Sequence, residues 1–153
     1  MVYNFNYEKQ KWEFTQKITT PASVTGDRVG HSVSFSGRYL VVGSPYNSQF
    51  GNHTGNVYIY QQASEDSDSF TASDTRYSPI PSLNADFGWS VDVNSKGVIA
   101  VGAKGDRGNV GSVYIFKTSS VTTWTHVFTL DPADIVPSHP YGNFGWAVAI
   151  DEE

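Results

Sequence analysis

Cysteine is absent from this chain of 153 residues, which excludes disulfide bonds and thiolate metal sites. Charged residues are scarce at 16 %, while aromatic residues reach 14 %, and a disordered chain shows the opposite balance. Basic residues are outnumbered, so the formal net charge is −5 and bulk electrostatics disfavours nucleic acid and anionic membranes as partners. The length fits one ordinary domain.

Long apolar runs are missing as well. Runs such as Val98-Ile99-Ala100-Val101 are short, whereas a membrane-spanning helix needs about 20 apolar residues. The N-terminus has no basic segment followed by an apolar one, so no secretory signal is visible. We expect either an intracellular protein or a mature piece of an exported one.

What the chain does contain is an internal repeat. One pattern recurs around Gly30, Gly88 and Gly145, which are 58 and 57 residues apart. A second pattern, Gly-x-Val-Tyr-Ile-aromatic, occupies 55–60 and 111–116, with an earlier variant at 2–8. A third pattern is an aromatic residue followed six positions later by an aliphatic one, at 12–18, 77–83 and 124–130. Because these patterns recur in one order at one period, they predict a repeat protein.

Each repeat is interpreted as four short strands. In the first, Val33 and Phe35 alternate with serines, and Val91 and Val93 repeat this alternation, which is typical of a half-buried strand. The second strand is a continuous apolar run, the third is rich in β-branched and aromatic residues, and the fourth carries the third pattern. Four antiparallel strands in each repeat predict an all-β fold of β-propeller blades.

These patterns resemble the FG-GAP repeats of the integrin α-subunit head and related propellers. The matching pieces are Phe87-Gly88, Phe144-Gly145 and the variant Val29-Gly30, then Val42-Gly43-Ser44-Pro45 and Val101-Gly102-Ala103-Lys104, then the two Gly-x-Val-Tyr segments. The resemblance implies the end of one blade over 1–20, blades over 29–83 and 87–130, and the first strand of a further blade over 144–153. A closed propeller has roughly 4–8 blades. We therefore expect a partial propeller, either a piece of a longer array or a subunit of an oligomeric ring.

Integrin blades that bind calcium carry an acidic loop between strands one and two, where carboxylate oxygens wrap the ion. The counterpart here is a degenerate loop containing Asp92 and Asn94, in which Lys96 replaces an acidic ligand. We expect no metal or other cofactor, calcium included, in these loops. We also expect no enzyme activity, because the four histidines lack metal-ligand spacing and no nucleophile motif is present.

Several loop residues are candidates for contact with a ligand. Tyr46 and Phe50 are aromatic residues in a polar loop, where they could stack on a sugar or a protein. Asp106 and Arg107 lie between strands two and three; turn chemistry is the favoured interpretation of them, and contact with a ligand is the alternative. Asn52 begins an Asn-His-Thr triplet, which is a possible glycosylation acceptor in a predicted loop.

The resemblance implies a non-catalytic extracellular or cell-surface module for protein–protein interaction, adhesion or structural assembly. Its partners would be proteins or neighbouring blades of the same or another chain, with glycans as a further class. Two alternatives stay open: a carbohydrate-binding propeller, and a propeller appended to an enzyme whose catalytic part lies outside this sequence. Because Trp89 and Trp146 follow the FG element at the same position, we expect them to pack between blades.

Overall fold

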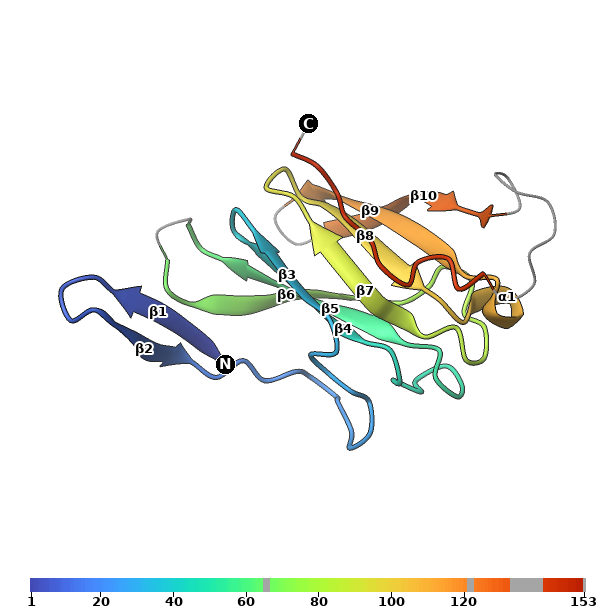
Figure 1. The fold of residues 1–153 in the computed structure, drawn as a ribbon, viewed down its shortest axis with the longest axis horizontal. Helices are drawn as coiled ribbons and strands as arrows, with labels where there is room; N and C mark the ends of the chain where they lie inside the picture. Colours follow the sequence, from blue (N-terminus) through green and yellow to red (C-terminus); the bar gives the residue numbers. More distant parts are fainter. Residues whose placement is uncertain (65–66, 121–122, 133–141, 153) are drawn as a thin grey trace.

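The computed structural model describes residues 1–64, 67–120, 123–132 and 142–152 (Figure 1). These residues form three antiparallel sheets. The first is a two-stranded hairpin of β1 (Val2–Asn6) and β2 (Lys11–Gln16). In the described part of the chain, helix is confined to α1 (Asp106–Asn109), a single turn interrupted by left-handed backbone angles.

The other two sheets have four strands each, which neighbour one another in sequence order. Blade 1 consists of β3 (Val33–Ser36), β4 (Tyr39–Ser44), β5 (Asn56–Gln62) and β6 (Phe70–Arg76). Blade 2 consists of β7 (Phe87–Val93), β8 (Val98–Ala103), β9 (Ser112–Ser120) and β10 (Thr123–Leu130). Four-stranded antiparallel sheets of this kind are propeller blades, so the predicted all-β fold class is confirmed.

The fourth strand of blade 1 lies earlier than the sequence pattern predicted. It is β6, and the segment 77–83 holds no strand. Two prolines in that segment have no N–H to donate to a ladder, so it serves as a connection between blades. The true counterpart of Trp124 is Phe70, because Phe70 lies opposite Gln62 in blade 1 as Trp124 lies opposite Thr118 in blade 2.

The strand predicted after Phe144 is also not formed. Phe144 makes a single bridge to Gly111, as Phe87 does to Gly55, and the residues that follow are unpaired as far as 152. In both blades the first strand pairs with the second strand of the same sheet.

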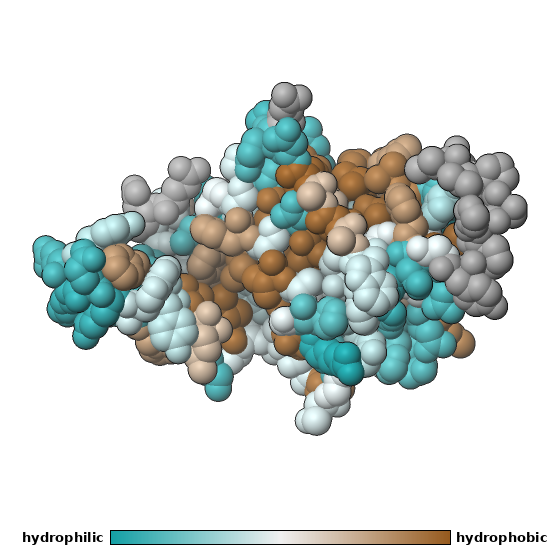
Figure 2. All heavy atoms as spheres, in the orientation of Figure 1, coloured by the Kyte–Doolittle hydropathy of each residue, from teal (hydrophilic) through white to brown (hydrophobic). Residues whose placement is uncertain are grey.

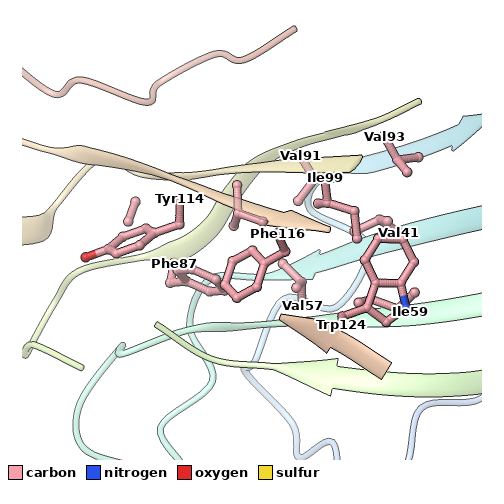
Figure 3. Close-up of a cluster of buried hydrophobic side chains, with 12 residues drawn as sticks. Val41, Val57, Ile59, Phe87, Val91, Val93, Ile99, Tyr114, Phe116 and Trp124 are labelled. Carbon is pink, nitrogen blue, oxygen red and sulfur yellow. The ribbon is translucent and has the colours of Figure 1, made fainter. Parts of the chain in front are cut away.

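The main hydrophobic core lies between the two blades (Figure 3). Blade 1 contributes Val41, Val57 and Ile59, which are fully buried. Blade 2 contributes a larger set, namely Phe87, Val91, Val93, Ile99, Val101, Ala103, Tyr114, Phe116 and Trp124. These residues come mostly from the continuous apolar runs, which explains why strands two and three are buried on both faces. Full burial of each large side chain contributes about 1.5–3 kcal/mol.

The joint between the blades requires glycine on the second strand. Gly43 packs so closely on Gly88 that a Cβ at Gly43 would overlap the Gly88 carbonyl oxygen, and Gly102 stands in the same relation to Gly145. A serine hydroxyl also donates to each of these carbonyls, Ser32 to Gly88 at 2.9 Å and Ser90 to Gly145 at 2.7 Å. The segment 144–152 therefore begins a second joint of the same construction.

Candidate functional site: loop contacts and the uncovered face of blade 1

Tyr46 and Phe50 do not form one binding platform. The Tyr46 ring is stacked on His53, with 4.2 Å between ring centroids, and the Arg28 guanidinium lies 4.2 Å from the same ring. Phe50 is more than half exposed and makes an edge contact with Tyr77 at 4.8 Å. The ring of Tyr46 is thus already occupied by protein, while Phe50 belongs to a different surface.

Asp106 faces the interior rather than a ligand. Its carboxylate accepts hydrogen bonds from the Tyr114 hydroxyl at 2.7 Å, the Ser82 hydroxyl at 2.5 Å and the Arg107 backbone N–H at 3.0 Å. Burial, followed by the hydrogen bond to Asp106, raises the pKa of Tyr114 to about 12. Asp106 therefore links the loop before β9 by hydrogen bonds to β9 itself, through Tyr114, and to the connection between blades, through Ser82.

Arg107 separates from Asp106 in space. Its backbone is left-handed, with φ of 52°, and its guanidinium forms an ion pair with Asp131 at the end of β10. The two residues point to different partners, so they do not form a shared ligand site. Both positions have the structural role that turn chemistry predicts for an Asp-Arg-Gly loop.

Asp92 and Asn94 connect the first strands of successive repeats. Asp92 accepts hydrogen bonds from the Ser34 hydroxyl at 2.6 Å and from the Ile150 backbone N–H at 2.8 Å. Asn94 donates to the Asp151 carbonyl at 2.9 Å and accepts from the Val98 N–H at 2.9 Å. Their oxygens are engaged by protein donors. Within the described ranges, no cluster of three acidic, histidine or cysteine side chains could hold a metal.

Asn52 is exposed, as a glycosylation acceptor must be. Its side-chain amide donates to the Asn84 side-chain oxygen at 3.0 Å, which ties this loop to the connection before blade 2. Thr54, the third residue of the triplet, is buried and bonded to the carbonyl of Gly51. Attachment of a glycan would therefore have to occur before this loop folds.

Trp89 and Trp146 contact each other across successive repeats, as the sequence analysis predicted. Their ring centroids are 5.1 Å apart, and the row continues to His31, whose ring lies 4.3 Å from Trp89. The Lys104 ammonium lies 3.9 Å from the Trp89 ring and forms an ion pair with Asp86 at 2.6 Å. The row joins successive repeats at the surface, because Trp146 is 58 % exposed, so the expected burial between blades is not observed.

Sequence reasoning missed the feature that distinguishes the two blades most. Val91 and Val93 are 8 % and 4 % exposed, because blade 1 covers them. Val33 and Phe35 occupy the same positions of the repeat in blade 1, yet they are 57 % and 55 % exposed. Figure 2 shows hydrophobic residues gathered in the centre of this view, where β3 and β7 lie. We call the side of blade 1 that carries Val33 and Phe35 the uncovered face.

The N-terminal hairpin covers only part of this face. Val2 and Ile18 pack against a small cluster that includes Leu40, Tyr60 and Phe70. A cavity of about 500 Å³ remains between the hairpin and blade 1. The hairpin covers blade 1 with two strands, whereas blade 1 covers the equivalent face of blade 2 with four strands. The uncovered face is therefore a half-complete version of the joint between the two blades.

This architecture defines the chain as a β-propeller module. A family model described as FG-GAP repeat matches residues 12–60 and 66–116, and a comparison with curated proteins found no match. The two matches cover more than half of the chain, which therefore belongs to the FG-GAP repeat family. The first match runs from β2 into β5 and the second contains β6 and runs into β9, so each sequence repeat spans a joint between sheets.

No helix in the described ranges has the length and apolar character needed to cross a membrane.

Proposed function

We propose that this chain is a non-catalytic recognition module of the cell surface or extracellular space, which assembles with protein partners through the uncovered face. The observation that carries this proposal is the exposure of Val33 and Phe35 at positions that are buried in blade 2. Apolar surface of this kind is unfavourable in water and is typical of surfaces that bind other proteins.

The shape of the uncovered face indicates which partners fit it. It is a β-sheet surface, and in blade 2 the equivalent surface is covered by another sheet. A matching partner therefore presents a sheet with apolar side chains, as neighbouring propeller blades of the same or another chain do. β1 also has one unpaired edge among the described residues, to which a further strand can add.

Light scattering over a concentration series tests this assembly. We expect the wild-type mass to rise above 16.8 kDa with concentration, and the double variant Val33→Asp/Phe35→Asp to stay at 16.8 kDa. The matched control is Ile80→Asp/Leu83→Asp, because both residues are exposed aliphatics in the connection between blades. A wild-type protein that stays at 16.8 kDa throughout would contradict the proposal.

The cell-surface location needs its own test. Antibodies against the chain should stain intact cells of the source organism as strongly as permeabilised cells, and staining only after permeabilisation would contradict an external location. If the chain passes through a secretory route, Asn52 should carry a glycan that glycosidase removes and that Asn52→Gln abolishes.

The carbohydrate-binding alternative relied on Tyr46 and Phe50 as exposed stacking residues. It is weakened because the Tyr46 ring is covered by His53 and Arg28. The alternative of an appended enzyme concerns sequence outside these residues, and a longer transcript encoding a catalytic domain would support it.

A further inference from the structure

A groove of about 520 Å³ opens at the rim of the molecule, between β6 of blade 1 and β10 of blade 2. It is distinct from the uncovered face, with which it shares neither Val33 nor Phe35. Rings and prolines dominate its wall, notably Phe50, Tyr77, Pro79, Pro81, Trp124 and His126. The volume and the apolar lining fall in the range of ligand pockets, which is about 300–1,000 Å³.

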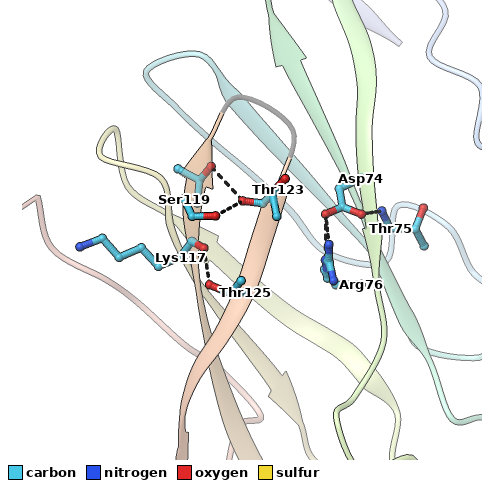
Figure 4. A network of polar contacts seen from close by, with 8 residues as sticks. Asp74, Thr75, Arg76, Lys117, Ser119, Thr123 and Thr125 are labelled. Carbon is cyan, nitrogen blue, oxygen red and sulfur yellow. Dashed lines mark hydrogen bonds and ion pairs between the residues drawn. The ribbon is translucent and has the colours of Figure 1, made fainter.

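The groove runs along the edges of two strands. β6 pairs only with β5 and β10 pairs only with β9 in the described residues, so each has an unpaired edge (Figure 4). Thr75 and Arg76 both line the groove from β6, and the consecutive residues 124–126 line it from β10. Successive side chains of a strand point to opposite faces. Consecutive lining residues therefore place the two backbone edges at the groove, where the Thr75 N–H of β6 already donates to the Asp74 carboxylate at 2.8 Å. The edge of β10 is therefore the one to which a strand can add.

The charges at the groove are compensated within the protein. Arg76 forms an ion pair with Asp74, to which its Nε donates at 2.8 Å. The His126 Nε2 lies 2.8 Å from the Thr129 hydroxyl, and the Thr125 hydroxyl donates to the Lys117 carbonyl at 3.3 Å. A charged ligand would find no free opposite charge among these groups, so a neutral ligand matches the groove.

The floor of the groove continues the joint between the blades. Phe116 and Trp124 belong both to the buried core and to the groove lining. The Trp124 indole N–H is buried and has no hydrogen-bond acceptor among the described residues. A sheet-on-sheet interface that ends in two open strand edges can be extended outward by one more strand.

We propose that this rim groove binds an extended, uncharged peptide segment with proline or aromatic side chains. The peptide backbone would pair with the edge of β10, and alternate side chains would contact Phe50 and Tyr77 above the buried Trp124. A saccharide fits less well, because its hydroxyl groups need several free polar side chains, whereas Arg76 and Thr125 are already bonded.

A phage library of random dodecapeptides, selected on the full chain, provides the probe. We expect enriched uncharged peptides whose affinity, measured by calorimetry with the synthetic peptide, falls at least about tenfold in Phe50→Ala and in Tyr77→Ala. The matched control is Phe14→Ala, because Phe14 is as exposed as Phe50 but lies in the N-terminal hairpin. These variants leave the buried Trp124 intact, so a loss of affinity does not depend on unfolding.

The four tryptophans provide a second readout. Bound peptide should shift the indole N–H signal of Trp124 in an NMR spectrum and leave those of Trp12, Trp89 and Trp146 in place. The proposal is overturned if no peptide is enriched, if the groove variants bind as wild type, or if a glycan array shows binding that the same variants abolish. None of these outcomes bears on assembly through the uncovered face, which uses other residues.

Discussion

Equivalent faces of blade 1 and blade 2 meet different neighbours, although the repeat builds them from equivalent residues. Towards blade 2, four strands pack on four strands, and Val91 and Val93 are almost fully buried. Towards the N-terminus, two strands face four, and Val33 and Phe35 stay more than half exposed. The residue types are alike, so the difference arises from what covers them and not from their hydrophobicity. A repeat of this family therefore presents the same apolar face whether or not a full sheet covers it.

The family matches explain why this is so. Each matched segment spans a joint, with the last strand of one sheet followed by the first three strands of the next. A repeat protein gains stability from its nearest-neighbour interfaces, and an incomplete interface leaves part of that stability unrealised. Predictions that compare equivalent residues on the two sides test this view.

The largest effect should come from the glycines of the joints. Gly43→Ala places a methyl group on the Gly88 carbonyl in the complete joint, where two packed sheets cannot move apart without losing their core. We expect a loss of about 3 kcal/mol in the free energy of unfolding, measured by urea denaturation. Gly102→Ala is the matched variant, because its methyl group meets the Gly145 carbonyl and the Ser90 hydroxyl, as that of Gly43→Ala meets the Gly88 carbonyl and the Ser32 hydroxyl, but the described segment at Gly145 forms no sheet. It should cost less than about 1 kcal/mol, and equal losses would contradict the comparison.

The second-largest difference in the free energy of unfolding should separate two equivalent positions of the repeat, Val93 in blade 2 and Phe35 in blade 1. Val93→Ala removes buried methyl groups and should cost about 2 kcal/mol in urea denaturation, since a cavity forms between the blades. Phe35→Ala removes a larger side chain, yet it should cost less than about 1 kcal/mol because Phe35 is mostly exposed. These values apply at concentrations where the chain is monomeric. If the Phe35 variant loses more stability than the Val93 variant, the uncovered face is covered in solution.

The buried tyrosines predict a loss of stability at high pH. Burial raises the pKa of Tyr114, in the complete joint, to about 12 from an ordinary value of 10.0. A raised pKa means that the folded state holds the proton more tightly, so the contribution is full below pH 10 and is lost as the pH rises towards 12. At about pH 11 the loss should be about 1 kcal/mol. Tyr114→Phe should show a shallower fall between these pH values, and an unchanged fall would contradict this assignment.

The smallest effect should come from Glu152. Hydrogen bonds from Ser95 and then Ser36 lower the pKa of its carboxylate, so it favours the folded state above its ordinary pKa and stops doing so as the pH falls through the lowered value. Acidification should therefore release 144–152 from blade 2 before the blades unfold. The change in Trp146 fluorescence should follow this release, and Glu152→Gln should shift it, while Glu8→Gln in the hairpin turn should not.

Much of the fold was predictable, because the second and third strands of each blade are continuous apolar or β-branched runs. The glycine on each second strand is a further signal, since it marks a position where two backbones pack closely. The outer strand β6 was not predictable, since it carries one buried anchor, Phe70, among polar residues, while the proline-containing 77–83 imitates the pattern. Of the loop candidates, Asp106 and Tyr46 turned out to be held by protein partners. Those partners, such as Ser82 and Arg28, are distant in sequence or lie in another loop, so spacing could not reveal them.

Hydrogen exchange of the first strands at several protein concentrations tests the central claim most directly. In dilute solution, the amides of β3 should exchange faster than those of β7, because only β7 has a full sheet packed against it. As the concentration rises and the uncovered face becomes occupied, the protection of β3 should approach that of β7. Equal protection of the two strands at every concentration would contradict the claim that blade 1 presents an unfilled joint.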